Sequence, residues 1–162
     1  MDRFAVIGGD GFLGHNLVVE LTKRFPQASV TSLDVVQRYF PSTSAGSGSW
    51  TFLSTDLTDR SVLDGALAQV KPTTVFHTAS PWIGSGAEVC EKVNVLGTQT
   101  VVDSCKHNGV KQLVFTSSAG VVYNAVDLIN VDERLPVPEK PIDAYNDTKV
   151  SARSCARVLC WH

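Results

Sequence analysis

Short apolar runs alternate with segments of helical periodicity along the chain. The first run, RFAVIG at 3–8, leads through glycines into residues 11–25, where apolar positions recur at helical spacing until Pro26. We expect strands at 3–8, 28–35, 50–57 and 73–80, and a fifth strand within 111–123 that runs into a loop. Helical patterns fill 11–25, 59–70 and 87–109, and a last helix is expected within 131–155, after a Pro-rich loop. Buried-type strands alternating with helices predict an α/β domain, a doubly wound parallel sheet covered on both faces.

The first expected strand runs directly into the glycine-rich stretch GGDGFLG. This stretch fits two spacings, G-x-G-x-x-G from Gly9 and G-x-x-G-x-x-G from Gly8, and both include Gly11 and Gly14. Glycine is needed where the backbone turns sharply and where a side chain would collide with a pyrophosphate, and the following helix stabilises the phosphates. A strand, this turn and a helix in succession therefore predict a dinucleotide-binding site.

Asp34 ends the second expected strand, about 20 residues after the turn, where a carboxylate meets the ribose hydroxyls of NAD. Its charge would repel a 2′-phosphate, which favours NAD over NADP. Arg38 keeps NADP open as an alternative cofactor, because a nearby arginine can pair with that phosphate. Asp56, after the third expected strand, either reaches the adenine or caps the helix that starts near Asp59.

Two segments nearer the C-terminus combine residues suited to proton transfer. Tyr145 and Lys149 are four residues apart, so both project from the same helical face. A free phenol ionises only near pH ~10, and a neighbouring ammonium favours the phenolate, which makes tyrosine a usable base. A serine hydroxyl from the end of the fifth expected strand, Ser117 or Ser118, can hold the substrate oxygen during proton transfer.

The segments GGDGFLG, HTAS, VNVLGT, FTSSAGVVY and DAYNDTK stand in the order expected of the extended short-chain dehydrogenase/reductase family. The chain resembles that family from residue 3 to about residue 152. The family's turn, G-x-x-G-[FY]-[LI]-G, selects Gly8, Gly11 and Gly14 and leaves Gly9 as a neighbour that mimics the commoner spacing. The resemblance implies a Rossmann-type sheet, an NAD or NADP cofactor, and hydride transfer at a secondary alcohol or ketone.

The resemblance also implies roles for individual residues. Tyr145 would be the acid/base, Lys149 would activate it and hold the nicotinamide ribose, and Ser118, ahead of Ser117, would orient the substrate oxygen. Asn94 would support the active-site lysine, and His77 the cofactor loop; a packed helical asparagine and a plain strand-end histidine are the alternatives. The residues expected at the cofactor are Gly8, Gly11, Phe12, Leu13, Gly14, Asp34, Asp56, Leu57, Thr78, Ala79, Asn94, Tyr145 and Lys149, and no metal site is expected.

Residues 131–149, VDERLPVPEKPIDAYNDTK, look most like the 3β-hydroxysteroid dehydrogenase branch, especially its decarboxylating sterol-4α-carboxylate 3-dehydrogenases. That resemblance implies oxidation of the 3β-hydroxyl of a sterol or steroid, after which the resulting β-keto acid loses the carboxyl group on carbon 4. A nucleotide-sugar epimerase or dehydratase of the same extended family stays open as an alternative. A non-catalytic NAD(P)-binding module is the alternative from another class.

The resemblance ends after Ala152, where family members continue with an Ala-Glu step, further strands and a substrate-binding lobe, and this chain has Arg153. We therefore expect an NAD(P)-binding domain with the catalytic residues at 1–152 and an atypical tail at 153–162. The tail also resembles translation in a shifted frame or through an unspliced intron. Because the C-terminal strands and the substrate lobe are not expected here, two alternatives stay open: the chain is an active dehydrogenase, or it is an inactive fragment of one. Residues 41–49, PSTSAGSGS, form a flexible low-complexity segment within the domain.

Composition limits the partners and the location. With 43% hydrophobic residues, 19% charged residues and a net charge of −2, nucleic acid and anionic membranes are not expected as main partners. No apolar stretch is long enough to span a bilayer. The four cysteines lack zinc-ligand spacing and predict reduced, mostly buried thiols on the cytoplasmic side. The resemblance also implies association with the endoplasmic reticulum. Apolar surface that a missing lobe would leave uncovered keeps a homo-oligomer open as an alternative.

Overall fold

The computed structural model describes residues 1–40, 49–82, 84–132 and 134–157. Most of the low-complexity segment expected at 41–49, and the last five residues of the expected tail, therefore lie outside the described residues.

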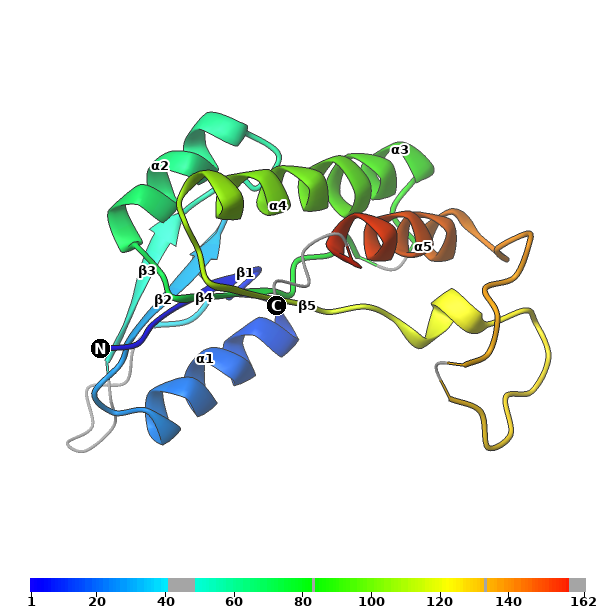
Figure 1. The fold of residues 1–162 in the computed structure, drawn as a ribbon, viewed down its shortest axis with the longest axis horizontal. Helices are drawn as coiled ribbons and strands as arrows, with labels where there is room; N and C mark the ends of the chain where they lie inside the picture. Colours follow the sequence, from blue (N-terminus) through cyan, green and yellow to red (C-terminus); the bar gives the residue numbers. More distant parts are fainter. Residues whose placement is uncertain (41–48, 83, 133, 158–162) are drawn as a thin grey trace.

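Five parallel strands form a sheet in the order β3-β2-β1-β4-β5 (Figure 1). The strands are β1 (Arg3–Ile7), β2 (Ser29–Asp34), β3 (Trp50–Ser54), β4 (Thr74–His77) and β5 (Gln112–Phe115). The chain adds strands on one side of β1 as far as β3 and then crosses to the other side for β4 and β5. This reversal confirms the doubly wound parallel sheet, and it makes the crevice between the carboxyl ends of β1 and β4 the expected place for a ligand.

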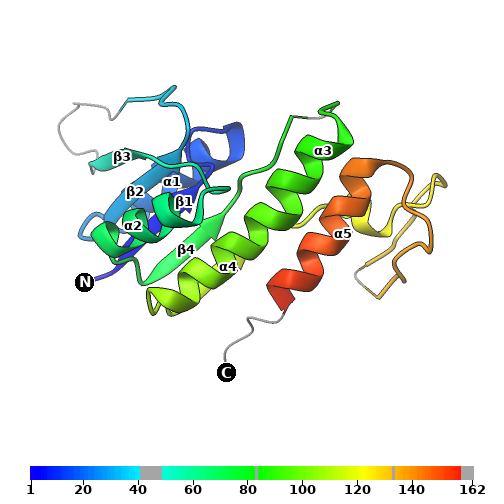
Figure 2. The ribbon, with the colours of Figure 1, turned by 90° about the horizontal axis from the view of Figure 1, so that it is seen from above.

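Helices cover both faces of this sheet (Figures 1 and 2). The helices are α1 (Phe12–Arg24), α2 (Arg60–Val70), α3 (Ala87–Cys90), α4 (Gly97–His107) and α5 (Ala144–Arg157), with a π-helical segment η1 (Glu91–Leu96) and a 3-10 turn η2 (Ala119–Val122). Helix α1 lies on one face, and α2, α4 and α5 lie on the other. Segments α3, η1 and α4 run on as one long helix, which confirms the helix expected over 87–109.

The central strand β1 is buried on both faces, because its alternate side chains point to opposite helical layers. The edge strand β5 is partly exposed, and Val114 is 48% exposed. Along β1, Phe4 and Val6 belong to one core, and Ala5 and Ile7 belong to the other. The core toward α2 and α4 includes Ile7, Leu33, Leu63, Leu67, Val75 and Val101. The core toward α1 includes Phe4, Val6, Val18, Leu21, Val30 and Trp50.

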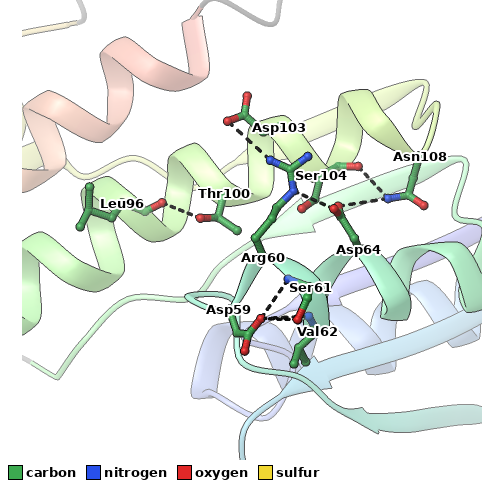
Figure 3. Close-up of polar contacts among 10 residues, drawn as sticks. All are labelled: Asp59, Arg60, Ser61, Val62, Asp64, Leu96, Thr100, Asp103, Ser104 and Asn108. Atoms are coloured by element: carbon green, nitrogen blue, oxygen red, sulfur yellow. Dashed lines mark hydrogen bonds and ion pairs between the residues drawn. The ribbon is translucent and has the colours of Figure 1, made fainter.

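Polar contacts fix the start of α2 and join it to α4 (Figure 3). The carboxylate of Asp59 accepts hydrogen bonds from the amides of Ser61 and Val62 at 2.9 and 3.1 Å, so Asp59 is the N-cap. The Arg60 guanidinium lies between Asp64, at 2.8 Å, and Asp103 of α4, at 3.8 Å. These contacts are exposed, so the apolar core contributes more to the packing of α2 on α4 than they do.

Asp56 does not cap this helix. Its Oδ1 accepts hydrogen bonds from the amide and the hydroxyl of Thr58, both at 2.8 Å, and its carbonyl accepts from the amide of Asp59 at 3.1 Å. Asp56 therefore shapes the turn before α2, and the capping role left open for it belongs to Asp59.

Three glycines of GGDGFLG are required by packing alone. Gly8 has a φ of 80°, and its carbonyl oxygen lies 2.0 Å from the position that a Cβ on Gly14 would take. A Cβ on Gly9 would lie 2.4 Å from the hydroxyl oxygen of Ser32 and 2.8 Å from the carbonyl oxygen of Val6. Gly9, which is not part of the family's spacing, therefore lets the turn pack against β1 and β2, a role that the spacing of the glycines does not show.

His77, the last residue of β4, is a buried core histidine with an exposed fraction of 1%. Its Nε2 lies 3.0 Å from Oγ1 of Thr98 on α4, and its ring centroid lies 5.4 Å from that of Phe115. Burial, and secondarily the charge of Lys149, lowers the pKa of His77 to about 3. The neutral ring thus joins β4 to α4, which favours the strand-end alternative over support of the cofactor loop.

The thiols within the described chain are free. Cys90 and Cys105 are buried and Cys155 is half-buried, which agrees with the expected reduced cysteines, and Cys160 lies outside the described residues. Burial raises the pKa of the Cys105 thiol to about 12, so this thiol stays protonated. Among the described residues, no helix is both long and apolar enough to cross a bilayer.

We predict that Gly9→Ala destabilises the fold and that Gly65→Ala stabilises it. The new Cβ at position 9 would overlap Ser32 and Val6, whereas nothing lies within 4 Å of a Cβ at position 65, in the middle of α2. We expect a loss of roughly 1–3 kcal/mol for Gly9→Ala and a gain of about 0.5–1 kcal/mol for Gly65→Ala. Urea unfolding followed by circular dichroism measures both, and equal midpoints for the two variants would contradict the packing role of Gly9.

We also predict that His77 makes the fold less stable in acid. The unfolded chain binds a proton at His77 below pH ~6.5, but the folded chain does so only near pH 3, so stability falls as the pH drops through this window. The expected contribution between pH 7.5 and pH 5 is about 2 kcal/mol. Urea unfolding of wild type and His77→Gln at both pH values isolates this contribution of His77 to the free energy of unfolding. Equal losses in the two proteins would show that the neutral His77 does not cause the effect.

Candidate functional site

A large open pocket, of about 740 Å³, lies at the carboxyl ends of β1, β2, β3 and β4. Its volume is within the range of small-molecule and cofactor sites. The pocket brings together ten of the residues expected at the cofactor, which are Gly8, Gly11, Phe12, Leu13, Gly14, Asp34, Asp56, Leu57, Thr78 and Ala79. Asn94, Ser117, Ser118, Tyr145 and Lys149 are not among the residues that line it.

One wall of the pocket is the glycine turn and the start of α1. Gly11 is the N-cap of α1 without a capping side chain, and the first turn of the helix contains no acidic residue. The first amides of a helix have no partner within it, so they favour an anion at this point. A Cβ on Gly11 would have only the Gly8 carbonyl oxygen nearby, at 3.2 Å, so this glycine leaves open space at the wall.

The exit of β4 gives the turn its shape. The Thr78 hydroxyl donates a hydrogen bond to the carbonyl of Ile7 at 2.9 Å, which ties β4 to β1 just before the turn. A Cβ on Gly8 would lie 2.6 Å from backbone atoms of Ala79. Thr78 and Ala79 therefore hold the turn in place as well as lining the pocket.

Asp34 presents its carboxylate at the end of β2. Its Oδ1 accepts a hydrogen bond from the amide of Val35 at 2.8 Å, and its Oδ2 accepts one from the amide of Asp10 at 3.0 Å. Both donors are main-chain groups, and Asp34 is half-buried at the pocket edge. A carboxylate with two oxygens has further lone pairs, so it can still accept hydrogen bonds from hydroxyls.

Asp10 is a site residue that the sequence analysis did not single out. It is 1% exposed, and its carboxylate accepts hydrogen bonds from the Ser32 hydroxyl at 2.6 Å and from the amides of Arg38 and Tyr39 at 2.6 and 2.9 Å. Its position inside the glycine turn was the only signal in the sequence. Its partners lie more than 20 residues away, and nothing in the spacing of the chain marks them.

Tyr145 and Lys149 lie on one face of α5, as their spacing predicts. The Lys149 ammonium lies 5.8 Å from the ring centroid of Tyr145 and 5.4 Å from that of Phe115. It donates a hydrogen bond to the carbonyl of Thr116, just beyond β5, at 3.4 Å. Lys149 is 3% exposed, and this burial lowers its pKa.

The two candidate serines differ in their surroundings. The Ser118 Oγ accepts a hydrogen bond from the amide of Gly120 at 3.1 Å, which caps η2, and Ser117 is exposed. A Cβ on Gly120 would overlap the side-chain oxygen of Asn146, so η2 packs directly against the first turn of α5. The structure therefore places the Ser118 turn against the helix that carries Tyr145.

Asn94 connects the pocket wall to α5. It lies in η1, 2% exposed, and its amide nitrogen donates to the Thr148 hydroxyl at 3.0 Å. Its side-chain oxygen accepts from the hydroxyl of Ser80, which lines the pocket, at 3.3 Å. Thr148 in turn donates to the carbonyl of Tyr145 at 2.9 Å. Of the two alternatives for Asn94, this placement favours support of the active-site helix.

Two relatives with known names match most of this chain. It is 39% identical over 157 residues to the decarboxylating sterol-4-alpha-carboxylate 3-dehydrogenase of Saccharomyces cerevisiae, covering 94% of this chain and 44% of that protein. It is 40% identical over 149 residues to the human protein of that name, covering 91% of this chain and 37% of that protein. The chain therefore spans less than half the length of these relatives.

Solved structures share the fold. The Bordetella bronchiseptica enzyme WbmG in complex with NAD superposes with a TM-score of 0.80 at 23% identity, covering 96% of this chain and 49% of that one. The Thermus thermophilus UDP-glucose 4-epimerase complex with NAD gives a TM-score of 0.78 at 26% identity, covering 96% and 50%.

The family model of the 3-beta hydroxysteroid dehydrogenase/isomerase family matches residues 5–157. This match includes the glycine turn, the pocket-lining strand ends and the Tyr145–Lys149 face of α5. With nearly the whole length matched, the chain belongs to the 3-beta hydroxysteroid dehydrogenase/isomerase family.

Proposed function

We propose that this chain binds NAD in the pocket at the glycine turn and supplies the proton-transfer residues for oxidation of the 3β-hydroxyl of a sterol or steroid. The main observation behind this proposal is that ten of the residues expected at the cofactor line one pocket. Both structural neighbours described above are complexes with NAD.

The pocket fits the parts of a dinucleotide. The uncapped start of α1, without acidic residues in its first turn, suits the pyrophosphate, and Gly11 leaves room for its approach. Asp34, with its carboxylate oriented by two amides, suits the hydroxyls of the adenosine ribose. Asp56 and Leu57 line the same end of the pocket.

Tyr145 would take the proton from the substrate hydroxyl as the base of the oxidation. The Lys149 ammonium lies 5.8 Å from the Tyr145 ring centroid, on the same face of α5, so the two groups are close enough to act together on one substrate. The Ser118 Oγ is an acceptor toward Gly120, so its own proton is free to donate to the substrate oxygen. NAD, when bound, supplies the hydride acceptor.

The sterol class rests on the relatives. The relatives at 39% and 40% identity carry names for dehydrogenases of sterol-4-alpha-carboxylate. The β-keto acid formed by such an oxidation loses carbon dioxide readily, which explains why one name covers both steps. A nucleotide-sugar substrate is less well supported than a sterol, since the epimerase neighbour is only 26% identical to this chain.

A second candidate is a module that binds NAD without turnover. The observation behind it is that Ser118, Tyr145 and Lys149 are not among the residues that line the pocket. The two candidates share the pocket and differ in whether Tyr145 matters.

We predict that the chain binds NADH and that Gly11→Ala weakens this binding at least about tenfold, because the added methyl group occupies space needed by the pyrophosphate. Gly11 has an ordinary φ of −77°, but its Cβ would lie 3.2 Å from the Gly8 carbonyl oxygen, so urea unfolding of the variant checks that the fold is kept. NADH fluorescence titration measures the affinity, with Gly65→Ala as the matched control. An unaltered dissociation constant in Gly11→Ala would contradict the assignment of the phosphate site.

We further predict that Tyr145→Phe lowers turnover of a 3β-hydroxysteroid about 10²–10⁴-fold, the usual contribution of a general acid–base group. NADH affinity should stay within about threefold of wild type, because the phenol hydroxyl acts on substrate. Absorbance at the reduced-cofactor band follows turnover with saturating NAD. NADH binding without any Tyr145-dependent turnover would decide for the binding module.

A further inference from the structure

We propose that Asp10 positions the ribose-binding end of the pocket, and that its buried charge acts with that of Asp34 to favour a cofactor without a 2′-phosphate. This inference rests on the proposed function, because it concerns the cofactor that the pocket would hold. It goes beyond that function by assigning cofactor choice to a residue of the glycine turn.

Asp10 is the centre of a network between the glycine turn and the segment that follows β2. Its Oδ1 accepts from two successive amides, those of Arg38 and Tyr39, at 2.6 and 2.9 Å. Its Oδ2 accepts from the Ser32 hydroxyl at 2.6 Å. Three donors converge on two oxygens, which suits an ionised carboxylate, because both of its oxygens only accept.

The main chain of Asp10 also orients Asp34. The Asp10 amide donates to Oδ2 of Asp34 at 3.0 Å, and the Val35 amide donates to Oδ1 at 2.8 Å. The backbone of Asp10 thus fixes the carboxylate that would meet the ribose, and its side chain fixes the start of the next segment. One residue holds both sides of this end of the pocket.

Tyr39 is held from a second side. Its ring stacks on His15 of α1, with centroids 3.7 Å apart and planes inclined by 12°. His15 also packs edge-on against Trp50 of β3, at a centroid distance of 6.1 Å. This stack and the hydrogen bond to Asp10 hold the segment after β2 onto α1, and Arg38 and Tyr39 line the pocket with Asp34.

The charges at the ribose-binding end of the pocket make the preference for NAD over NADP sensitive to Asp10. Asp10, Asp34 and Asp56 are the carboxylates among the described residues that line the pocket, and Arg38 is the cation. The Arg38 guanidinium lies 3.5 Å from the Asp10 carbonyl oxygen, so it stays near the same turn. A buried charge is poorly screened and acts over several ångströms, so removal of one carboxylate leaves Arg38 less opposed in attracting a 2′-phosphate.

Asp10→Asn separates charge from geometry. Its oxygen can still accept from both amides, and the Ser32 hydroxyl can turn to accept from the new amide group. Ser32→Ala is the matched control, since it removes one hydrogen bond from the network and keeps the charge. Asp10→Ala removes charge and geometry together.

The test is fluorescence titration of NADH and NADPH against wild type and the three variants, with urea unfolding of each. We expect Asp10→Asn to lower the ratio of the NADPH to the NADH dissociation constant about five- to tenfold, with NADH affinity within about threefold of wild type. Ser32→Ala should leave the ratio within about twofold, and Asp10→Ala should weaken both cofactors at least about tenfold.

An unchanged ratio in Asp10→Asn, or the same change in Ser32→Ala, would overturn the role in cofactor choice. Full NADH affinity in Asp10→Ala would overturn the positioning role. Wild type that binds neither cofactor would instead overturn the proposed function, and this inference with it.

Discussion

The close approach of the glycine turn to the exit of β4 is the constraint on which the pocket depends. A Cβ on Gly8 would lie 2.6 Å from the backbone of Ala79, and a Cβ on Gly14 would lie 2.0 Å from the Gly8 carbonyl oxygen. These contacts bring the start of α1 directly against β1 and β4. The unpaired amides of the helix therefore face the point where the strand order reverses, which is where doubly wound sheets bind their ligands.

A second constraint places α5, and it is almost independent of the first. Asn94 reaches α5 through Thr148, and Gly120 packs against Asn146, so the helix is held at its first turns. The hydrogen bond from Ser80 to Asn94 links this region to the pocket wall. The π-helical form of η1 belongs to this link, and such segments are often found at functional sites.

The sequence predicted the strands, the long helix and the Tyr145–Lys149 face because each depends on local periodicity. It could not predict the roles of Asp10 and Gly9, because these depend on contacts with Ser32 and the segment after β2, more than 20 residues along the chain. The π-helical segment was missed for the same reason. Local periodicity identifies a helix over 87–109 but carries no signal for the change of hydrogen-bond pattern at Glu91–Leu96. Gly97, just after that segment, packs against Leu57 so closely that a Cβ would lie 2.2 Å from it, and this contact is equally invisible in the local sequence.

Two buried charges lie at the site, the Asp10 carboxylate beside the pocket and the Lys149 ammonium on α5, and they differ in how many of their hydrogen bonds this chain supplies. The Asp10 carboxylate accepts three hydrogen bonds at 2.6 to 2.9 Å, which compensate its removal from water. The Lys149 ammonium has three donors, and within the described residues its hydrogen-bond partner is the Thr116 carbonyl at 3.4 Å, with two aromatic rings beside it. The Asp10 carboxylate is thus satisfied by residues of this chain, whereas Lys149 retains donors for a bound group. Turnover therefore depends on a bound group that completes the surroundings of Lys149, whereas the hydrogen bonds of Asp10 that shape the pocket are complete without one.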